Sequence, residues 1–63
     1  MYLLTLKEVM HLTGLRRSSI YKFMEEGYFP KSVSIGGRSV MWSEEDVQSW
    51  ILKRITLRNL LGE

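Results

Sequence analysis

Apolar residues near the start of the chain recur at the spacing that places side chains on one face of a helix. They are Leu6, Val9 and Met10. Thr5 and Glu8 match a capping box, in which each side chain bonds a free backbone amide at the start of a helix. The pattern therefore predicts a first helix over about residues 6–12.

A second set of apolar residues repeats the helical spacing after an abrupt corner. The set is Ile20, Phe23 and Met24. Gly14 suits the left-handed backbone conformation that closes a helix, and Leu15 can fold back as an apolar plug between two packed helices. Gly27 is a stop signal of the same kind, so we predict a second helix over about residues 17–26.

The apolar spacing then changes from that of a helix to that of a strand. Pro30 prevents a helix from continuing, and polar and apolar residues alternate after it. Gly36 and Gly37 allow the positive φ angles of a two-residue turn, and a three-residue turn that includes Arg38 also fits. We predict a short basic hairpin over about residues 32–42.

A third helix is expected over about residues 44–55. Ser43 can cap it, and three acidic residues follow in the first turn, where they favour the positive end of the helix dipole. Its predicted core-facing residues are Val47, Trp50 and Ile51, and Trp42 and Trp50 supply large rings to the core. Residues 56–63 form a tail without a clear pattern, and its apolar residues are Leu57, Leu60 and Leu61.

Taken in order, these elements predict one domain over residues 1–63, mainly α-helical with a small β-hairpin. Two helices joined by a glycine corner and followed by a hairpin and a third helix form a winged helix-turn-helix. A domain of about 60 residues buries only about 60% of the surface that its unfolded chain exposes. We therefore expect a thin core.

Basic residues gather on the part of the chain that includes the corner, the second helix and the hairpin. They are Arg16, Arg17, Lys22, Lys31 and Arg38, within a chain of net charge +2. Acidic residues lie at the end of the second helix, Glu25 and Glu26, and at the start of the third. Because the placement of charge matters more than its total, double-stranded DNA is the partner that we expect.

The exposed face of the second helix is basic and rich in hydroxyl groups in its first half only. At about 100° per residue, the apolar stripe leaves Ser18 and Lys22 opposite it, with Arg17, Ser19 and Tyr21 beside it. Glu25 and Glu26 in the second half would repel phosphate. The N-terminal half is therefore expected to enter the DNA groove, as in recognition helices of this class.

Residues 3–51 resemble the AlpA-type regulators of phages and integrative elements, within the MerR-like and excisionase-like winged helix-turn-helix group. The matching motifs are Leu6-Lys7-Glu8-Val9, Leu12-Thr13-Gly14-Leu15, Ser18-Ser19-Ile20-Tyr21-Lys22, Glu26-Gly27-Tyr28-Phe29-Pro30-Lys31, Gly36-Gly37-Arg38, and Trp42 through to Trp50-Ile51. The resemblance implies a DNA-binding regulator of prophage or genomic-island genes, such as an integrase gene, and relatives with this fold act as excisionases. Where many relatives have a serine cap, this chain has Arg16, so Ser18 is a candidate cap for a later helix start.

We expect the DNA contacts to divide into base-reading and backbone-anchoring groups. Arg17, Ser18, Tyr21 and Lys22 are predicted to meet base edges and flanking phosphates, and Arg16, Lys31 and Arg38 to anchor the backbone. With the second serine and the hairpin glycine, the predicted DNA-binding residues are Arg16, Arg17, Ser18, Ser19, Tyr21, Lys22, Lys31, Gly37 and Arg38.

Several of these residues also have a purely structural interpretation. Tyr21 lies at the edge of the apolar stripe, so its position fits core packing as well as DNA contact. Ser18 and Ser19 are common helix-capping residues, and Gly37 and Arg38 fit an ordinary hairpin turn. Arg17 and Lys22 fit a solvated helix face.

Other functions are less consistent with the sequence. The neighbouring carboxylates Glu44, Glu45 and Asp46 are explained by their favourable position at the positive end of the helix dipole. We therefore predict that the chain is not an enzyme and has no small-molecule substrate. His11 is the single histidine and there is no cysteine, so no metal or other cofactor is expected. Gly36-Gly37-Arg38 lacks the Gly-Lys-Ser/Thr ending of a nucleotide-binding loop.

Two alternatives to transcriptional regulation remain. One is an excisionase, or recombination directionality factor, which bends an attachment site and contacts an integrase. The other is a protein–protein interaction module that uses the second helix or the leucine-rich tail, and self-association on DNA is a further expectation for that tail.

No apolar run approaches the ~20 residues that span a membrane, and no secretory signal is visible, so we expect a soluble cytoplasmic protein.

Overall fold

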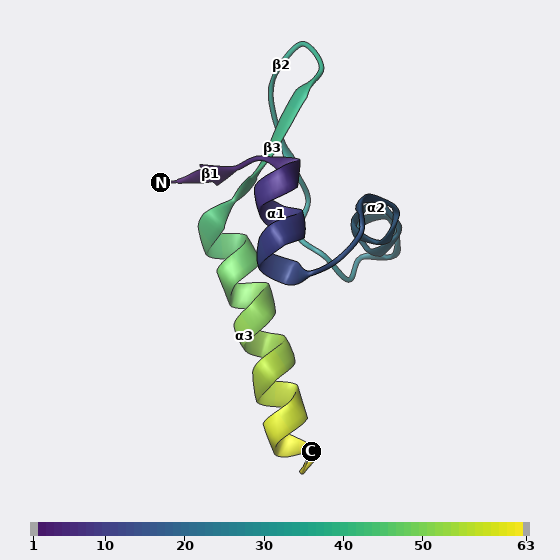
Figure 1. Ribbon diagram of the computed structural model, residues 1–63, viewed down its shortest axis with the longest axis vertical. Helices are drawn as coiled ribbons and strands as arrows, with labels where there is room; N and C mark the ends of the chain where they lie inside the picture. Colours follow the sequence, from purple (N-terminus) through teal and green to yellow (C-terminus); the bar gives the residue numbers. More distant parts are fainter. Residues whose placement is uncertain (1, 63) are drawn as a thin grey trace.

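The computed structural model describes residues 2–62 as three helices and a small antiparallel sheet. In chain order the elements are β1 (Leu3–Leu4), α1 (Leu6–Thr13), α2 (Arg17–Glu26), β2 (Val33–Gly36), β3 (Ser39–Ser43) and α3 (Glu44–Leu60). The molecule measures 44 × 25 × 19 Å. Along its long axis, the β2–β3 wing points one way and α3 points the other, with α2 beside the body between them (Figure 1). The predicted winged helix-turn-helix is confirmed.

The capping box at the start of α1 is confirmed. The backbone N–H of Thr5 donates to Oε1 of Glu8 at 2.8 Å, and the N–H of Glu8 donates to Oγ1 of Thr5 at 3.2 Å. These bonds satisfy two amides that have no partner within the helix. The fixed start of α1 places Val9 in the core, where it is completely buried.

The corner between α1 and α2 is built by Thr13 and Gly14, and α1 ends at Thr13, one residue later than predicted. Gly14 has φ 72° and its N–H donates to the carbonyl of Met10 at 2.8 Å. The Thr13 hydroxyl donates to the carbonyl of Val9 and accepts a bond from the N–H of Leu15. Leu15 then packs against the core, as expected. Hydrogen bonds therefore hold the backbone of the corner both before and after Gly14.

Helix α2 begins at Arg17, and the alternative in which Ser18 caps a later start is wrong. Arg16 is the N-cap residue in extended conformation, and its side chain makes no capping bond. Its carbonyl already accepts the first helical bond from Ile20, so Ser18 lies within the first turn. Gly27, at φ 81°, ends the helix as predicted.

The sheet contains a strand that the sequence did not reveal. Strand β1 pairs antiparallel with β3, through Leu3 with Ser43 and Leu4 with Trp42, and the strand order is β1-β3-β2. Two residues are too few to show the alternation that identifies a strand. This pairing nevertheless buries Leu4 in the core.

The wing turn consists of Gly37 and Arg38, which corrects the prediction of a Gly36–Gly37 or a three-residue turn. Gly36 pairs with Ser39 and belongs to β2, where an irregularity lies between Ser34 and Gly36. Gly37 has φ 56°, whereas Arg38 does not have a positive φ. A positive φ at the first turn position only is typical of a type II′ hairpin turn.

Helix α3 continues to Leu60, five residues beyond the predicted end at position 55. Its cap is as expected, since the Ser43 hydroxyl accepts a bond from the N–H of Asp46. No glycine or proline interrupts the sequence until Gly62, so the backbone can continue as a helix without support from the core. At about 1.5 Å per residue, α3 is ~25 Å long. Its last turns extend beyond the body (Figure 1).

The core consists of six buried apolar residues, each from a different segment of the chain. They are Leu4, Val9, Ile20, Phe29, Trp42 and Val47. Trp42 is the largest and is completely buried, as predicted. Trp50 and Ile51 are only half-buried and pack at its edge. Because α1, α2, α3 and the sheet all contribute, this core fixes the orientation of α2 relative to the wing.

Candidate nucleic-acid interface

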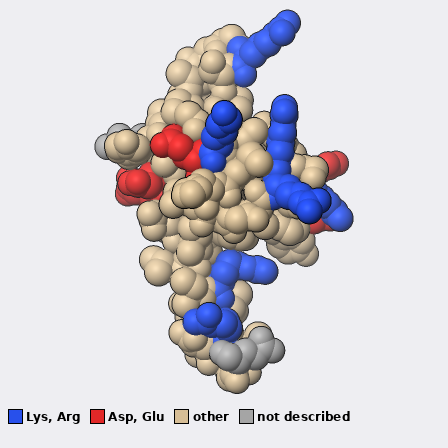
Figure 2. Space-filling view, in the orientation of Figure 1, with Lys and Arg blue, Asp and Glu red and all other residues tan. Residues whose placement is uncertain are grey.

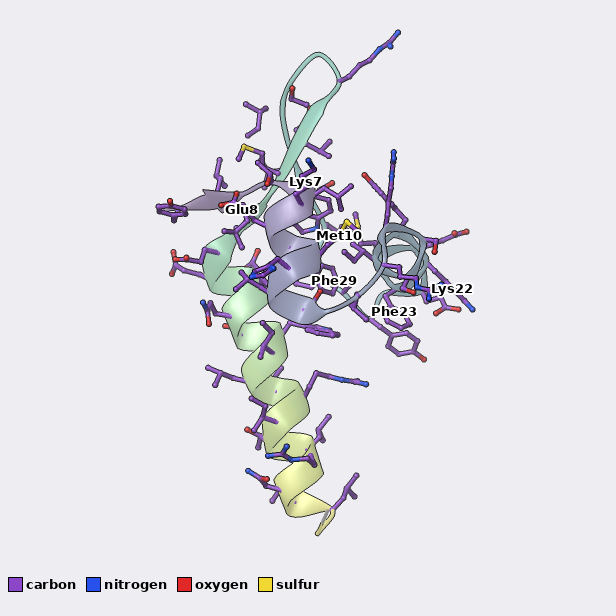
Figure 3. The ribbon with its side chains drawn as sticks, viewed as in Figure 1. Lys7, Glu8, Met10, Lys22, Phe23 and Phe29 are labelled. Carbon is purple, nitrogen blue, oxygen red and sulfur yellow. The ribbon has the colours of Figure 1, made fainter. Side chains whose placement is uncertain are left out.

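The N-terminal half of α2 presents a polar surface away from the core. Ile20 is completely buried and attaches this half of the helix to the body. Arg17, Ser18 and Lys22 are exposed, and Lys22 points away from the body (Figure 3). The corner at Gly14 turns the chain so that this surface is not covered by α1. A rigid, exposed helix face of this kind can enter a DNA major groove.

Tyr21 packs against the core and also keeps part of its side chain exposed. The ring lies edge-on to Trp42, with 6.4 Å between centroids and 66° between planes. The side chain is still 39% exposed. Packing against a buried tryptophan restricts the rotation of Tyr21, so that its free edge has a defined position beside Arg17 and Ser18.

The remaining predicted residues are Ser19 within α2 and four residues that flank α2 or lie on the wing. Arg16, Lys31, Gly37 and Arg38 are exposed, whereas Ser19 is half-buried. Arg38 occupies the wing turn, and Figure 2 shows a basic side chain extending from the wing tip. The structure thus brings the α2 residues together on one face and holds the wing residues at one end of the molecule, away from α2.

The segment between α2 and β2 is held by two tryptophans, which the sequence did not predict. Nε1 of Trp42 donates to the carbonyl of Pro30 at 3.2 Å, and Nε1 of Trp50 donates to the carbonyl of Tyr28. Phe29 between them is buried, and its ring centroid lies 4.9 Å from that of Trp50. Lys31 follows directly, so its backbone has a fixed position between α2 and the wing.

Charge is unevenly distributed over the surface. In Figure 2, basic side chains lie on the wing, around α2 and along the C-terminal half of α3. Acidic side chains gather where β1 meets the start of α3, and at the edge of α2. Glu25 and Glu26 are exposed in the last turn of α2. An anionic backbone would therefore be attracted to the wing and to the first turns of α2, and repelled from its last turn.

The described residues offer little for other kinds of site. Within residues 2–62, no three side chains of His, Cys, Asp or Glu lie close enough to hold a metal ion together. Over the same part of the chain, no helix has the length and apolar character needed to cross a membrane.

Comparison with known proteins identifies the family. Residues 2–55 match the family described as prophage CP4-57 regulatory protein (AlpA). The chain belongs to the AlpA family. The match includes β1, both helices of the helix-turn-helix and the wing, and it stops in α3 five residues before Leu60.

This AlpA-family chain is similar to a phage protein and to a bacterial protein. An uncharacterized protein, ORF88, of Enterobacteria phage P4 is 47% identical over 55 residues, which cover 87% of this chain and 62% of the phage protein. The DNA-binding transcriptional activator AlpA of Escherichia coli strain K12 is 31% identical over 61 residues, with 87% of each chain covered. The chain therefore spans less than two thirds of the length of the phage P4 relative.

Proposed function

We propose that this AlpA-family chain is a sequence-specific, double-stranded DNA-binding transcriptional regulator of prophage or genomic-island genes, such as an integrase gene. One observation carries the proposal: the first half of α2 is attached to the core by Ile20 and exposes Arg17, Ser18 and Lys22 on its outer side. The E. coli relative, which is a DNA-binding transcriptional activator, supports the same class of activity. No catalytic step is part of the proposal.

In the proposed complex, α2 reads base edges and the residues around it hold the DNA backbone. Arg17, Ser18, Tyr21 and Lys22 face the major groove and its flanking phosphates. An arginine that bonds both acceptors of a guanine contributes about 1–3 kcal/mol of discrimination against the wrong base. Ser19, which is half-buried, is closer to the body and can reach only a flanking phosphate.

Backbone contacts come from residues that border α2 and from the wing. Arg16 precedes the helix, Lys31 follows the segment held by the two tryptophans, and Arg38 lies at the wing tip. Gly37 has no side chain, so the wing can approach the backbone closely. These contacts position the protein on the duplex without reading sequence.

Self-association on DNA is a further part of the proposal. A single module of this type buries about 600–1,000 Å² on DNA, which gives weak binding by itself. The end of α3 carries Leu57, Leu60 and Leu61, which are 50%, 77% and 74% exposed. Contact between these leucines on neighbouring copies would remove apolar surface from water and strengthen binding at adjacent sites.

Selection of bound duplexes from a random pool tests the proposed function. The proposal predicts enrichment of one motif, with affinity for the enriched duplex falling steeply as salt rises. Absence of enrichment together with absence of salt-dependent binding would contradict it and favour a protein–protein interaction module. Enrichment of a sequence within an attachment site, with stimulated excision in the presence of integrase, would favour the excisionase alternative instead.

A further inference from the structure

The C-terminal half of α3 carries positive charge that the interface described above does not use. Lys53, Arg54 and Arg58 lie there, and residues 47–62 include no acidic residue. The acidic residues of α3 are confined to its first turn, as Glu44, Glu45 and Asp46. The helix is therefore divided into an acidic end at the sheet and a basic half that extends away from the body.

Two of these cations lie next to the recognition helix and the segment that follows it. Lys53 and Arg54 line a hollow of about 600 Å³ whose opposite wall is formed by residues 27–31, including Lys31. Asp46 also lines this hollow, two turns before Lys53. A smaller hollow of about 250 Å³ brings Arg54 beside Phe23 of α2. Two cations of α3 and one of the segment after α2 thus border one concave surface at the end of α2. Glu25 and Glu26 are exposed in the last turn of α2 but do not line this hollow.

Arg54 is held in place by an aromatic ring. Its Cζ atom lies 5.5 Å from the ring centroid of Trp50, within the range of a cation–π contact. Trp50 is itself fixed by its bond to the carbonyl of Tyr28 and by the ring of Phe29. The guanidinium therefore has a more defined position than that of an arginine on an unsupported surface, which reduces the entropy lost when it binds an anion.

The arrangement of the elements shows how one duplex can meet all of these cations. The wing lies at one end of the long axis, the basic half of α3 at the other, and α2 between them (Figure 1). Basic side chains on all three elements are visible on one face (Figure 2). The long axis measures 44 Å, which corresponds to ~13 base pairs at about 3.4 Å each.

We propose that Lys53 and Arg54 of α3 contact DNA backbone phosphates on the side of the recognition helix opposite the wing. The contact presupposes the duplex binding proposed above and extends it to a second flank. It gives the protein a footprint that is anchored at both ends, by Arg38 on one flank and by α3 on the other. Sequence reading remains with α2, since phosphate contacts carry no direct sequence information.

The test combines charge-removing variants with duplexes shortened from either end. Fluorescence anisotropy measures the affinity of the wild type, Lys53→Gln, Arg54→Gln and Arg38→Gln across a salt series. Each protein is titrated on an enriched duplex of about 20 base pairs and on two shorter versions, which each lack about 6 base pairs at a different end. Glu45→Gln is the control, since Glu45 is an exposed charge on the same helix but in its first turn, at the acidic end away from Lys53 and Arg54. Far-ultraviolet circular dichroism checks that each variant is folded.

The proposal predicts that Lys53→Gln and Arg54→Gln each weaken binding to the long duplex and reduce the slope of log K against log salt by about 0.9. Both effects disappear on one shortened duplex, and the effect of Arg38→Gln disappears on the other. Glu45→Gln reduces neither the affinity nor the slope. If neither α3 variant changes the affinity or the slope on the long duplex while Arg38→Gln still weakens binding, the α3 contact is contradicted and the proposed DNA binding is not. Loss of the α3 and Arg38 effects on the same shortened duplex would also contradict it. Failure of the wild type to bind any duplex would instead contradict the proposed function.

Discussion

The indole N–H of Trp50 in α3 donates to the backbone carbonyl of Tyr28, just after α2. The bond links two residues 22 positions apart and joins α3 to the segment that leads into the wing. Trp42 makes the corresponding bond to Pro30 from the sheet side. The direction of the chain between α2 and the wing is therefore set by two tryptophans in other elements.

Replacement of Trp50 by phenylalanine tests the energetic value of this bond. Trp50→Phe keeps an aromatic ring beside Phe29 and removes the N–H donor. Because a typical hydrogen bond contributes about 0.5–1.5 kcal/mol, we expect the free energy of unfolding to fall by ~1 kcal/mol in urea denaturation. In a domain of this size that corresponds to a melting temperature about 4–8 °C lower. An unchanged free energy of unfolding would show that the bond is not needed for stability.

The corner at Gly14 depends on a backbone conformation that other residues adopt at a cost. Gly14 has φ 72°, and apart from its own atoms and its two chain neighbours, residues 2–62 place no atom within 4 Å of the position where a Cβ would be. Strain in the backbone therefore decides the effect of a substitution. We expect Gly14→Ala to reduce the free energy of unfolding by about 1–2 kcal/mol. Gly14→Asn should cost less, because asparagine tolerates the left-handed region. Equal losses for the two variants in thermal denaturation would contradict this explanation.

The wing is expected to hold the DNA backbone without reading sequence. Arg38→Ala should weaken binding to an enriched and to a shuffled duplex by the same factor, and it should reduce the salt slope by about 1. Anisotropy titrations on both duplexes measure the two factors. A larger loss on the enriched duplex would assign base reading to the wing as well.

The leucines at the end of α3 are expected to support binding to adjacent sites. A variant with glutamine at positions 57, 60 and 61 keeps the net charge and the helix-forming tendency while removing the apolar contact. We expect it to reduce the affinity for two adjacent operators by roughly tenfold, or about 1.4 kcal/mol, and to leave the affinity for one operator unchanged.

Leu12→Gln is the control for that variant, since Leu12 is an exposed leucine on α1. It should alter neither affinity. If the triple variant retains the full affinity for adjacent operators in mobility-shift titrations, the leucines have no part in self-association.

Local signals in the sequence were sufficient for the elements that depend on neighbouring residues. The capping box of Thr5 and Glu8, the glycine at the corner and the stop at Gly27 each act over three or four positions. The same is true of the serine cap of α3. Such signals place helix starts and stops well, because the groups that they satisfy are close in the chain.

Features that depend on distant parts of the chain were missed. Strand β1 exists because Leu4 pairs with Trp42, and a two-residue strand has no pattern of its own. The burial of Phe29 and the bonds of both indoles follow from the packing of α3 and β3 around residues 28–30. In the wing, the irregularity in β2 moved the turn by one residue, so that Gly36 is in the strand.

The candidate interface was partly accessible from the sequence. Spacing alone predicted an exposed face with Ser18 and Lys22 and a buried Ile20, and the structure has this arrangement. The basic half of α3 was not predicted as part of any site. Its proximity to Lys31 appears only when the helix is folded beside residues 27–31.

The most direct test of base reading by α2 is the ratio of affinities for an enriched and a shuffled duplex, measured by anisotropy for the wild type, Arg17→Ala and Arg38→Ala. The proposed division of roles predicts that Arg17→Ala lowers this ratio by a factor equivalent to about 1–3 kcal/mol, whereas Arg38→Ala leaves the ratio unchanged. An equal decrease of this affinity ratio in both variants, or an unchanged ratio in Arg17→Ala, would contradict the proposed division of roles.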